Sequence, residues 1–156
     1  MEFPDPLRNK PILTPATAKL FEVRPEVPKL CPDKKQKFHS IVAQLLYILK
    51  RARPDLAPAV PFLTTRVCDP TDDDWLKLRH VIEYLTATKD LCLTLEVDKS
   101  KNPVFSIDAA HQVYGDCKGH TGGSFTMGKG SIFTVSCKQK INTRSSTEAE
   151  LVAVYD

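Results

Sequence analysis

Residues 131–156, SIFTVSCKQKINTRSSTEAELVAVYD, change from one periodicity to another within a single stretch. Residues 131–138 have the pattern of a strand. Ser145 to Asp156 predicts a helix, because Ser145-Ser146-Thr147-Glu148 has the Ser-x-x-Glu form of a capping box. Glu148 is then assigned a structural role at the start of that helix. A strand pattern that leads into a capped helix indicates a mixed α/β fold.

The sequence upstream supplies the rest of a predicted sheet. Four segments have strand patterns: 91–97, 104–109, 124–127 and 131–138. Apolar and polar residues alternate from Leu91 to Val97, which favours a strand with one buried face. The strand at 104–109 ends with Asp108. The glycine-rich residues 115–123 predict a loop, and Gly128-Lys129-Gly130 predicts the turn of a hairpin.

The first half of the chain is predicted to be helical. The predicted helices are 33–52, 55–68 and 71–88. The first has an apolar stripe at helical spacing, made of Phe38, Ile41, Val42, Leu45, Leu46 and Leu49. The second should be short or kinked, with Pro58 in its first turn, because Pro61 would break an interior hydrogen bond. The third begins with a capping box from Thr71 to Asp74, and Trp75 should be a core anchor.

The prolines, cysteines and apolar runs of the sequence indicate in which compartment the protein is expected. Residues 1–32 contain many of the twelve prolines and predict an extended, poorly packed linker. The five cysteines are odd in number and widely spaced, and no apolar signal segment precedes them. We therefore expect reduced thiols in an intracellular protein, cytoplasmic or nuclear. The longest apolar run, Leu45 to Leu49, is too short to span a bilayer, so no membrane partner is expected.

Basic residues gather near the first predicted helix. The net charge of +3 is too small to indicate a nucleic-acid partner by itself. The candidate phosphate-binding residues are Lys34, Lys35, Lys37, Lys50, Arg51 and Arg53. The alternative interpretation is a solvated helix face with basic ends, and charge alone does not separate the two.

Two carboxylates are candidates for chemistry. Asp108 ends an apolar strand, where a buried charge would need a partner or a metal. Position alone favours the alternative, an exposed residue at the strand end that bonds to a turn. Glu150 lies on a different side of the last helix from Glu148, which makes it the better candidate for a site.

Other chemistries have weaker patterns. A zinc site would draw on His111, Cys117, His120 and Cys137, but Cys117-x-x-His120 lacks a second close pair. Cys137 and His120 could form a nucleophile pair, with no third residue marked to orient them. The glycines of 119–130 do not have the spacing of a P-loop.

Several motifs resemble a known family. Residues 38–47 and Arg51-Ala52-Arg53-Pro54-Asp55 resemble the "LLYL" helix and "TRPDI" that follow the polymerase core of copia-type reverse transcriptases. Residues 74–90 resemble that family's tryptophan-containing helix. Residues 138–140 and 145–153, KQK and SSTEAELVA, resemble its "KQK…SSTEAEYVAL" closely. The resemblance covers roughly residues 16–156, and its last motif is the most specific.

The resemblance implies a fold and an activity. Residues 33–90 would be a helical thumb or connection segment of a reverse transcriptase, and residues 91–156 the first strands and first helix of an RNase H-like domain. The first metal-binding aspartate of that fold would then be Asp108, and the catalytic glutamate would be Glu150. Such a domain holds two Mg²⁺ ions about 4 Å apart and cleaves RNA in RNA–DNA hybrids.

The chain departs from the family in two respects. The further aspartates of the family lie beyond this sequence, and the polymerase motif Tyr-x-Asp-Asp is absent. Asp156 is six residues after Glu150, roughly opposite it on the helix, and is not expected to be a ligand. We therefore expect a polyprotein fragment that is inactive alone and whose partners are an RNA–DNA hybrid and the remainder of the polyprotein. The alternatives are a non-catalytic nucleic-acid-binding remnant and a gene fragment that does not fold stably.

Overall fold

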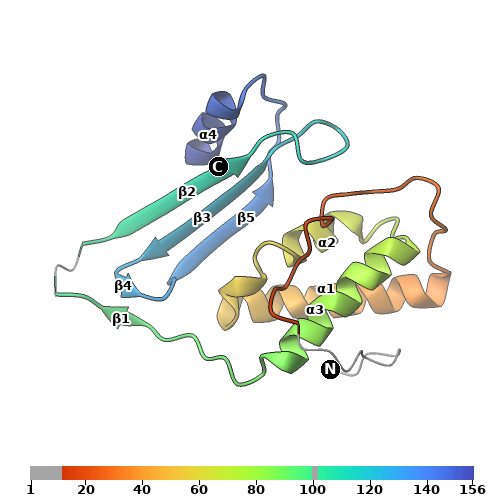
Figure 1. Cartoon of the computed structure of the whole chain (residues 1–156), viewed down its shortest axis with the longest axis horizontal. Coiled ribbons are helices and arrows are strands. Elements are labelled where there is room, and N and C mark those ends of the chain that lie inside the picture. The colour runs from red at the N-terminus through yellow and green to blue at the C-terminus, as the bar shows by residue number, and fades with distance from the viewer. Residues whose placement is uncertain (1–11, 100–101) are drawn as a thin grey trace.

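The computed structural model describes residues 12–99 and 102–156 and has a helical body and a sheet (Figure 1). The helical body contains α1 (Pro32–Arg51), η1 (Pro54–Leu56), α2 (Val60–Arg66) and α3 (Asp72–Ala87). The second part contains β1 (Glu96–Val97), β2 (Val104–Ala110), β3 (His120–Thr126), β4 (Gly128–Lys129), β5 (Phe133–Lys138) and α4 (Ser146–Tyr155). The expectation of a mixed α/β chain is confirmed at this level.

The apolar stripe of α1 forms much of the core of the helical body. Five of the six predicted stripe residues are buried: Phe38, Ile41, Val42, Leu45 and Leu49. The prediction is wrong for Leu46, which is 36% exposed at the margin of the stripe. Ala52 ends the helix, as expected from a chain that must leave helical geometry before Pro54.

The region after α1 is a short 3-10 turn and a seven-residue helix, so the prediction of a short or kinked helix is confirmed. Pro61 lies in the first turn of α2, where its missing N–H removes no helical hydrogen bond. Pro58 lies in the turn before that helix rather than within it. Phe62 and Leu63 then face the core.

The start of α3 has the predicted cap. The Thr71 hydroxyl accepts a hydrogen bond from the Asp74 N–H, and the Asp74 carboxylate accepts one from the Thr71 N–H. Trp75 is 3% exposed and belongs to the core cluster, as predicted. The reciprocal cap fixes where α3 begins and directs Trp75 inward.

Residues 12–31 contradict the expectation of a poorly packed linker. Leu20 and Leu30 are buried in the core cluster, and Phe21 packs against it. Arg24 forms an ion pair with Asp73 of α3 at 2.6 Å. The prolines prevent regular secondary structure here, but the apolar side chains between them still have a core to join. The same expectation for residues 1–11 lies outside the described residues.

The main sheet has three antiparallel strands in the order β2-β3-β5. The predicted pairing is confirmed, because β3 pairs with β5 from His120–Lys138 to Phe125–Phe133. The predicted turn is wrong for Gly128 and Lys129, which form β4 and pair with β1. The predicted loop at 115–123 is wrong after residue 119. Gly122 and Gly123 lie within β3, because both neighbouring strands fix that backbone with ladder hydrogen bonds.

The predicted buried strand at 91–97 is largely wrong. The strand is limited to Glu96 and Val97, which pair with Lys129 and Gly128 of β4. Leu91, Leu93 and Leu95 are 53%, 37% and 56% exposed. Alternating leucines require a partner strand and a covering layer, and the described residues supply neither along 91–95.

The sheet lies between two helical elements (Figure 1). The last helix, α4, contacts β2 and β3, and buries Ala149 and Ala153. On the other side, α2 contacts β5. Among the described residues, no helix combines the length and the apolar composition that a bilayer crossing requires.

Candidate functional site

Asp108 lies inside β2, two residues before the end of that strand. It pairs in register with Gly122, and Gly122 pairs with Ser136 of β5. Side chains of paired residues share one face of a sheet, so Asp108 and Ser136 point to the same side. The Ser136 hydroxyl donates to the Ala57 carbonyl, which identifies that side as the face toward the helical body. Asp108 is exposed and lines the groove between the two parts.

Glu150 lies on α4, which covers the opposite face of the sheet. Thr121 identifies that face, because it follows His120 in β3 and its hydroxyl donates to Asp156 Oδ2 at 2.9 Å. The Glu150 side chain is exposed, whereas its neighbour Ala149 is buried against the sheet. Asp156 thus has a hydrogen-bond partner in β3.

The start of α4 has the predicted type of cap with a shifted partner. The Ser145 hydroxyl accepts a hydrogen bond from the Glu148 N–H at 3.2 Å. The Glu148 carboxylate accepts one from the N–H of Arg144, one residue before the cap, at 2.7 Å. Glu148 therefore has the structural role assigned to it.

Asp108 and Glu150 belong to different layers of the fold. One carboxylate faces the helical body, and the other is on the helix that covers the opposite face of the sheet. Among residues 12–99 and 102–156, no group of three or more His, Cys, Asp or Glu side chains is placed to hold a metal ion. Two carboxylates alone do not make a two-metal centre, which needs several carboxylates around one position.

The zinc and cysteine alternatives are also not supported by the geometry. His120 is buried, and both of its ring nitrogens have protein partners, Tyr114 and Ser136. Cys137 pairs with Thr121, so its thiol points to the sheet face opposite His120. A Cys137–His120 nucleophile pair therefore cannot form. Burial raises the pKa of the Cys137 thiol, which further disfavours a reactive thiolate.

The candidate phosphate-binding residues divide into two groups at opposite ends of α1. Lys34, Lys35 and Lys37 are exposed on its first two turns. Lys50 and Arg51 are on its last turn, roughly 22 Å away along the helix axis. Lys50 Nζ lies 5.7 Å from the Phe133 ring centre and 3.5 Å from the Thr134 carbonyl oxygen. The cations do not form one cluster.

The expectation that Arg53 binds a phosphate is wrong. Its side chain is 9% exposed and forms an ion pair with Asp55 at 2.8 Å. Its guanidinium also donates to the Thr88 carbonyl at 3.0 Å and to the Thr88 hydroxyl at 2.7 Å. The hydrogen bonds with Asp55 raise the pKa of Arg53 further. Arg53 joins the end of α1 to the end of α3 and is not available to a phosphate.

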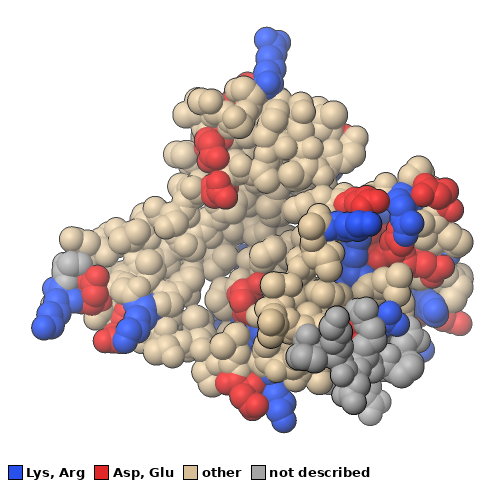
Figure 2. All heavy atoms as spheres, viewed as in Figure 1, with Lys and Arg blue, Asp and Glu red and all other residues tan. Residues whose placement is uncertain are grey.

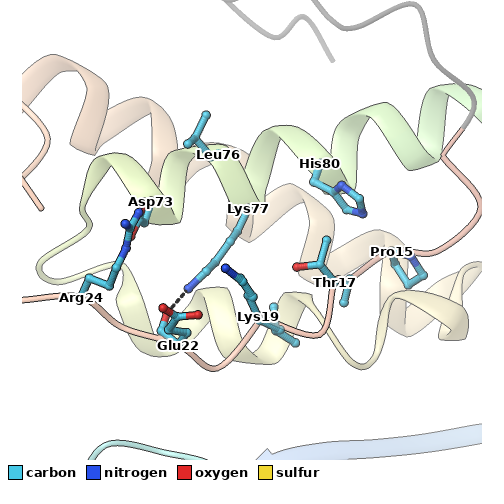
Figure 3. Close-up of a pocket in the computed structure, with 11 residues that line it drawn as sticks. Pro15, Thr17, Lys19, Glu22, Arg24, Asp73, Leu76, Lys77 and His80 are labelled. Atoms are coloured by element: carbon cyan, nitrogen blue, oxygen red, sulfur yellow. Dashed lines mark hydrogen bonds and ion pairs between the residues drawn. The ribbon is translucent and has the colours of Figure 1, made fainter.

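A pocket lies between residues 15–24 and α3 (Figure 3). Two of its lining cations, Arg24 and Lys77, are engaged by protein groups. Arg24 is paired with Asp73, and the Lys77 ammonium donates to the Glu22 carbonyl at 2.5 Å. Burial lowers the pKa of Lys77, and its Nζ also lies 4.7 Å from the Phe62 ring centre. The contacts around this pocket fasten residues 15–24 to α3.

Positive and negative side chains are interspersed on the face shown in Figure 2, over both the helical body and the sheet. This view shows no extended basic surface. A nucleic-acid interface on this chain would therefore depend on local groups of cations, such as those at the two ends of α1.

Three known proteins are similar to the chain. The Retrovirus-related Pol polyprotein from transposon TNT 1-94 of Nicotiana tabacum is 29% identical over 154 residues, covering 94% of this chain and 11% of the polyprotein. The Retrovirus-related Pol polyprotein from transposon RE2 of Arabidopsis thaliana is 35% identical over 149 residues, covering 95% and 10%. Secreted RxLR effector protein 161 of Plasmopara viticola is 30% identical over 118 residues, covering 75% and 83%.

The chain spans about a tenth of the length of the two polyproteins. No protein-family model matches the sequence, and no solved structure matches it significantly. The similarity to the two polyproteins extends over nearly the whole chain. The homologues of the chain therefore include retrovirus-related Pol polyproteins from copia-type transposons.

Proposed function

We propose that the chain joins the reverse-transcriptase part of a copia-type Pol polyprotein to its RNase H-like part and contacts the RNA–DNA hybrid there. The observation that carries this proposal is the order of elements. A compact helical body is followed by three antiparallel strands and then by a capped helix that carries the SSTEAEL motif. That order agrees with a thumb or connection segment before the start of an RNase H-like domain.

The hybrid contact is assigned to the two ends of α1. The ammonium groups of Lys35 and Lys37 extend from an exposed helix surface, and Lys34 lies over the Trp75 ring at 5.6 Å. Arg51 is exposed at the other end. Cations roughly 22 Å apart on one rod can contact phosphates on separate stretches of a duplex. Arg53 has no part in this contact.

We further propose that Mg²⁺-dependent cleavage of the RNA strand belongs to the parent polyprotein and not to this chain. Asp108 and Glu150 remain the candidate ligands for the parent, on the strength of the family resemblance. The described residues do not gather them into a metal centre. The function proposed for this chain is therefore to bind the hybrid without cutting it.

Fluorescence anisotropy with a labelled RNA–DNA hybrid tests the binding proposal. The triple variant Lys34→Glu, Lys35→Glu, Lys37→Glu should weaken binding roughly tenfold or more and lower the salt slope by about 2–3, because each phosphate contact releases about one counterion. The matched control is Lys118→Glu, Lys140→Glu, Arg144→Glu, which changes the net charge equally beyond the helical body. Equal losses in both variants would show that net charge, and not α1, governs binding.

A further inference from the structure

Four aromatic rings join the helical body to the sheet. Phe21 precedes α1, Phe62 is in α2, Tyr114 is in the loop after β2, and His120 begins β3. The Phe21 ring centre lies 5.5 Å from Phe62, 5.2 Å from Tyr114 and 5.5 Å from His120. Tyr114 and His120 are each 8% exposed. We call these four residues together with Ser136 the aromatic joint.

A chain of hydrogen bonds crosses the aromatic joint. Ser136 Oγ donates to the Ala57 carbonyl oxygen at 2.5 Å, which uses the hydroxyl proton of the serine. The same oxygen lies 2.8 Å from His120 Nε2, so Nε2 must carry the proton and donate it. His120 Nδ1 is then the acceptor, and the Tyr114 hydroxyl donates to it at 2.9 Å. This arrangement requires a neutral imidazole.

The surroundings of His120 offer little to stabilise an imidazolium. Lys138 lies opposite it in β5, is paired with Asp116 at 2.7 Å, and places its Nζ 4.6 Å from the Tyr114 ring centre. From α3, Lys77 lies over the Phe62 ring. Asp108 shares the sheet face but is exposed, two residues before the partner of His120 in β2. Burial lowers the pKa of His120.

We propose that neutral His120 fastens the sheet to the helical body, and that protonation of its ring releases the aromatic joint. A second ring proton would place an N–H on Nδ1, where the Tyr114 hydroxyl now donates. It would also put a positive charge into an apolar joint that Lys138 and Lys77 already border. The proposal depends on the joint geometry alone and is independent of hybrid binding.

The direction of the pH effect follows from linkage. The folded chain holds His120 neutral to a lower pH than the unfolded chain, whose histidine titrates at about 6.5. The unfolded or opened state therefore binds more protons below that pH. The contribution of neutral His120 to the stability of the closed joint is fully present above about pH 6.5. Below that pH, the equilibrium constant between the closed and the opened joint falls by up to about tenfold per pH unit. The loss levels off below the folded pKa.

The test is an NMR titration of the full chain from pH 7.5 to 5.0. We expect the His120 ring signals to titrate below pH 6.5, together with loss of the cross-relaxation peaks between the Phe62 and Tyr114 rings. His120→Gln keeps an amide donor for Ser136 and an acceptor for Tyr114, and should keep those peaks at pH 5.0. His39→Gln, an exposed histidine of α1, is the matched control and should behave as the wild type does.

Two results with the wild type would overturn the proposal. One is a His120 that titrates at or above pH 6.5. The other is a wild-type joint whose Phe62–Tyr114 peaks persist after His120 has become protonated. Ser136→Ala provides a second route if His120→Gln fails to fold. It removes the hydrogen bond to Ala57 and the acceptor of His120 Nε2 but leaves the imidazole in place, and it should loosen the joint already at pH 7.5. An unchanged joint in Ser136→Ala would also contradict the proposal.

Discussion

Tyr84 on α3 donates its hydroxyl to Asp55 Oδ2 at 2.8 Å and so joins two elements that are 29 residues apart in the sequence. Asp55 is also the ion-pair partner of Arg53. The Arg53-Pro54-Asp55 segment therefore holds the end of α1 against α3. Burial disfavours the Asp55 carboxylate, but hydrogen bonds from Arg53 and Tyr84 outweigh it and keep the pKa below its ordinary value.

Asp55→Asn should lower the free energy of unfolding by about 2–3 kcal/mol, because it leaves the nearly buried Arg53 guanidinium without a counter-charge. Urea denaturation at pH 7 measures the change. Tyr84→Phe removes one hydrogen bond and should lose about 1 kcal/mol. If Asp55→Asn lost no more than Tyr84→Phe, Arg53 would not depend on this carboxylate.

Acid should weaken the same network. A carboxyl group whose pKa is lower in the folded chain contributes stability above its unfolded pKa of about 4, and loses it as the pH falls through the folded value. We therefore expect the wild type to lose more stability than Asp55→Asn between about pH 5 and pH 3. Urea midpoints across that range give the difference. Parallel pH curves for the two proteins would contradict it.

The sequence predicted the parts of the fold that depend on neighbouring residues. The capping box at Thr71 and the stripe of α1 need partners only three or four residues away, so their patterns are visible in the sequence. The sequence does not show that Arg53 is buried: Asp55 is only two residues away, but Thr88, which also accepts hydrogen bonds from Arg53, is 35 residues away. His120 was considered only as a metal ligand or a base, although the structure gives it a role in the joint.

Asp74 is a buried carboxylate that caps the start of α3 and also forms an ion pair with Arg66. It is 1% exposed and accepts hydrogen bonds from the Thr71 N–H and from Arg66 Nε at 2.9 and 3.0 Å. Asp74→Ala should lower the free energy of unfolding by about 3 kcal/mol, because the cap and the ion pair are lost together. Asp72→Ala, on the exposed first turn, should lose less than about 1 kcal/mol. Equal losses would mean that charge near the helix end, and not the cap, matters.

The exposed leucines of 91–95 require a different test. The alternation of apolar and polar residues predicted a buried face. Such a pattern indicates only which side chains share a side of a strand, and not whether another layer covers them. Leu91→Ser with Leu95→Ser should change the free energy of unfolding by less than about 0.5 kcal/mol and should reduce self-association. Phe62→Ala, by contrast, should lose about 3–5 kcal/mol. A large loss in the serine variant, seen by urea denaturation, would show that these leucines are covered in solution.

The separation of Asp108 and Glu150 leads to a prediction about chemistry. Asp108 shares its sheet face with Ser136, whereas Glu150 is on the helix over the other face. A family motif could identify both residues in the sequence, but it could not show on which side of the sheet each would lie. The purified chain should therefore bind a labelled RNA–DNA hybrid without cutting it, with or without added Mg²⁺. Gel analysis of the RNA strand over hours measures this.

Asp108→Asn should leave the result unchanged, and a trace contaminating nuclease would cut equally in both proteins. Mg²⁺-dependent cleavage that disappears in Asp108→Asn would show that this chain assembles a working site by itself.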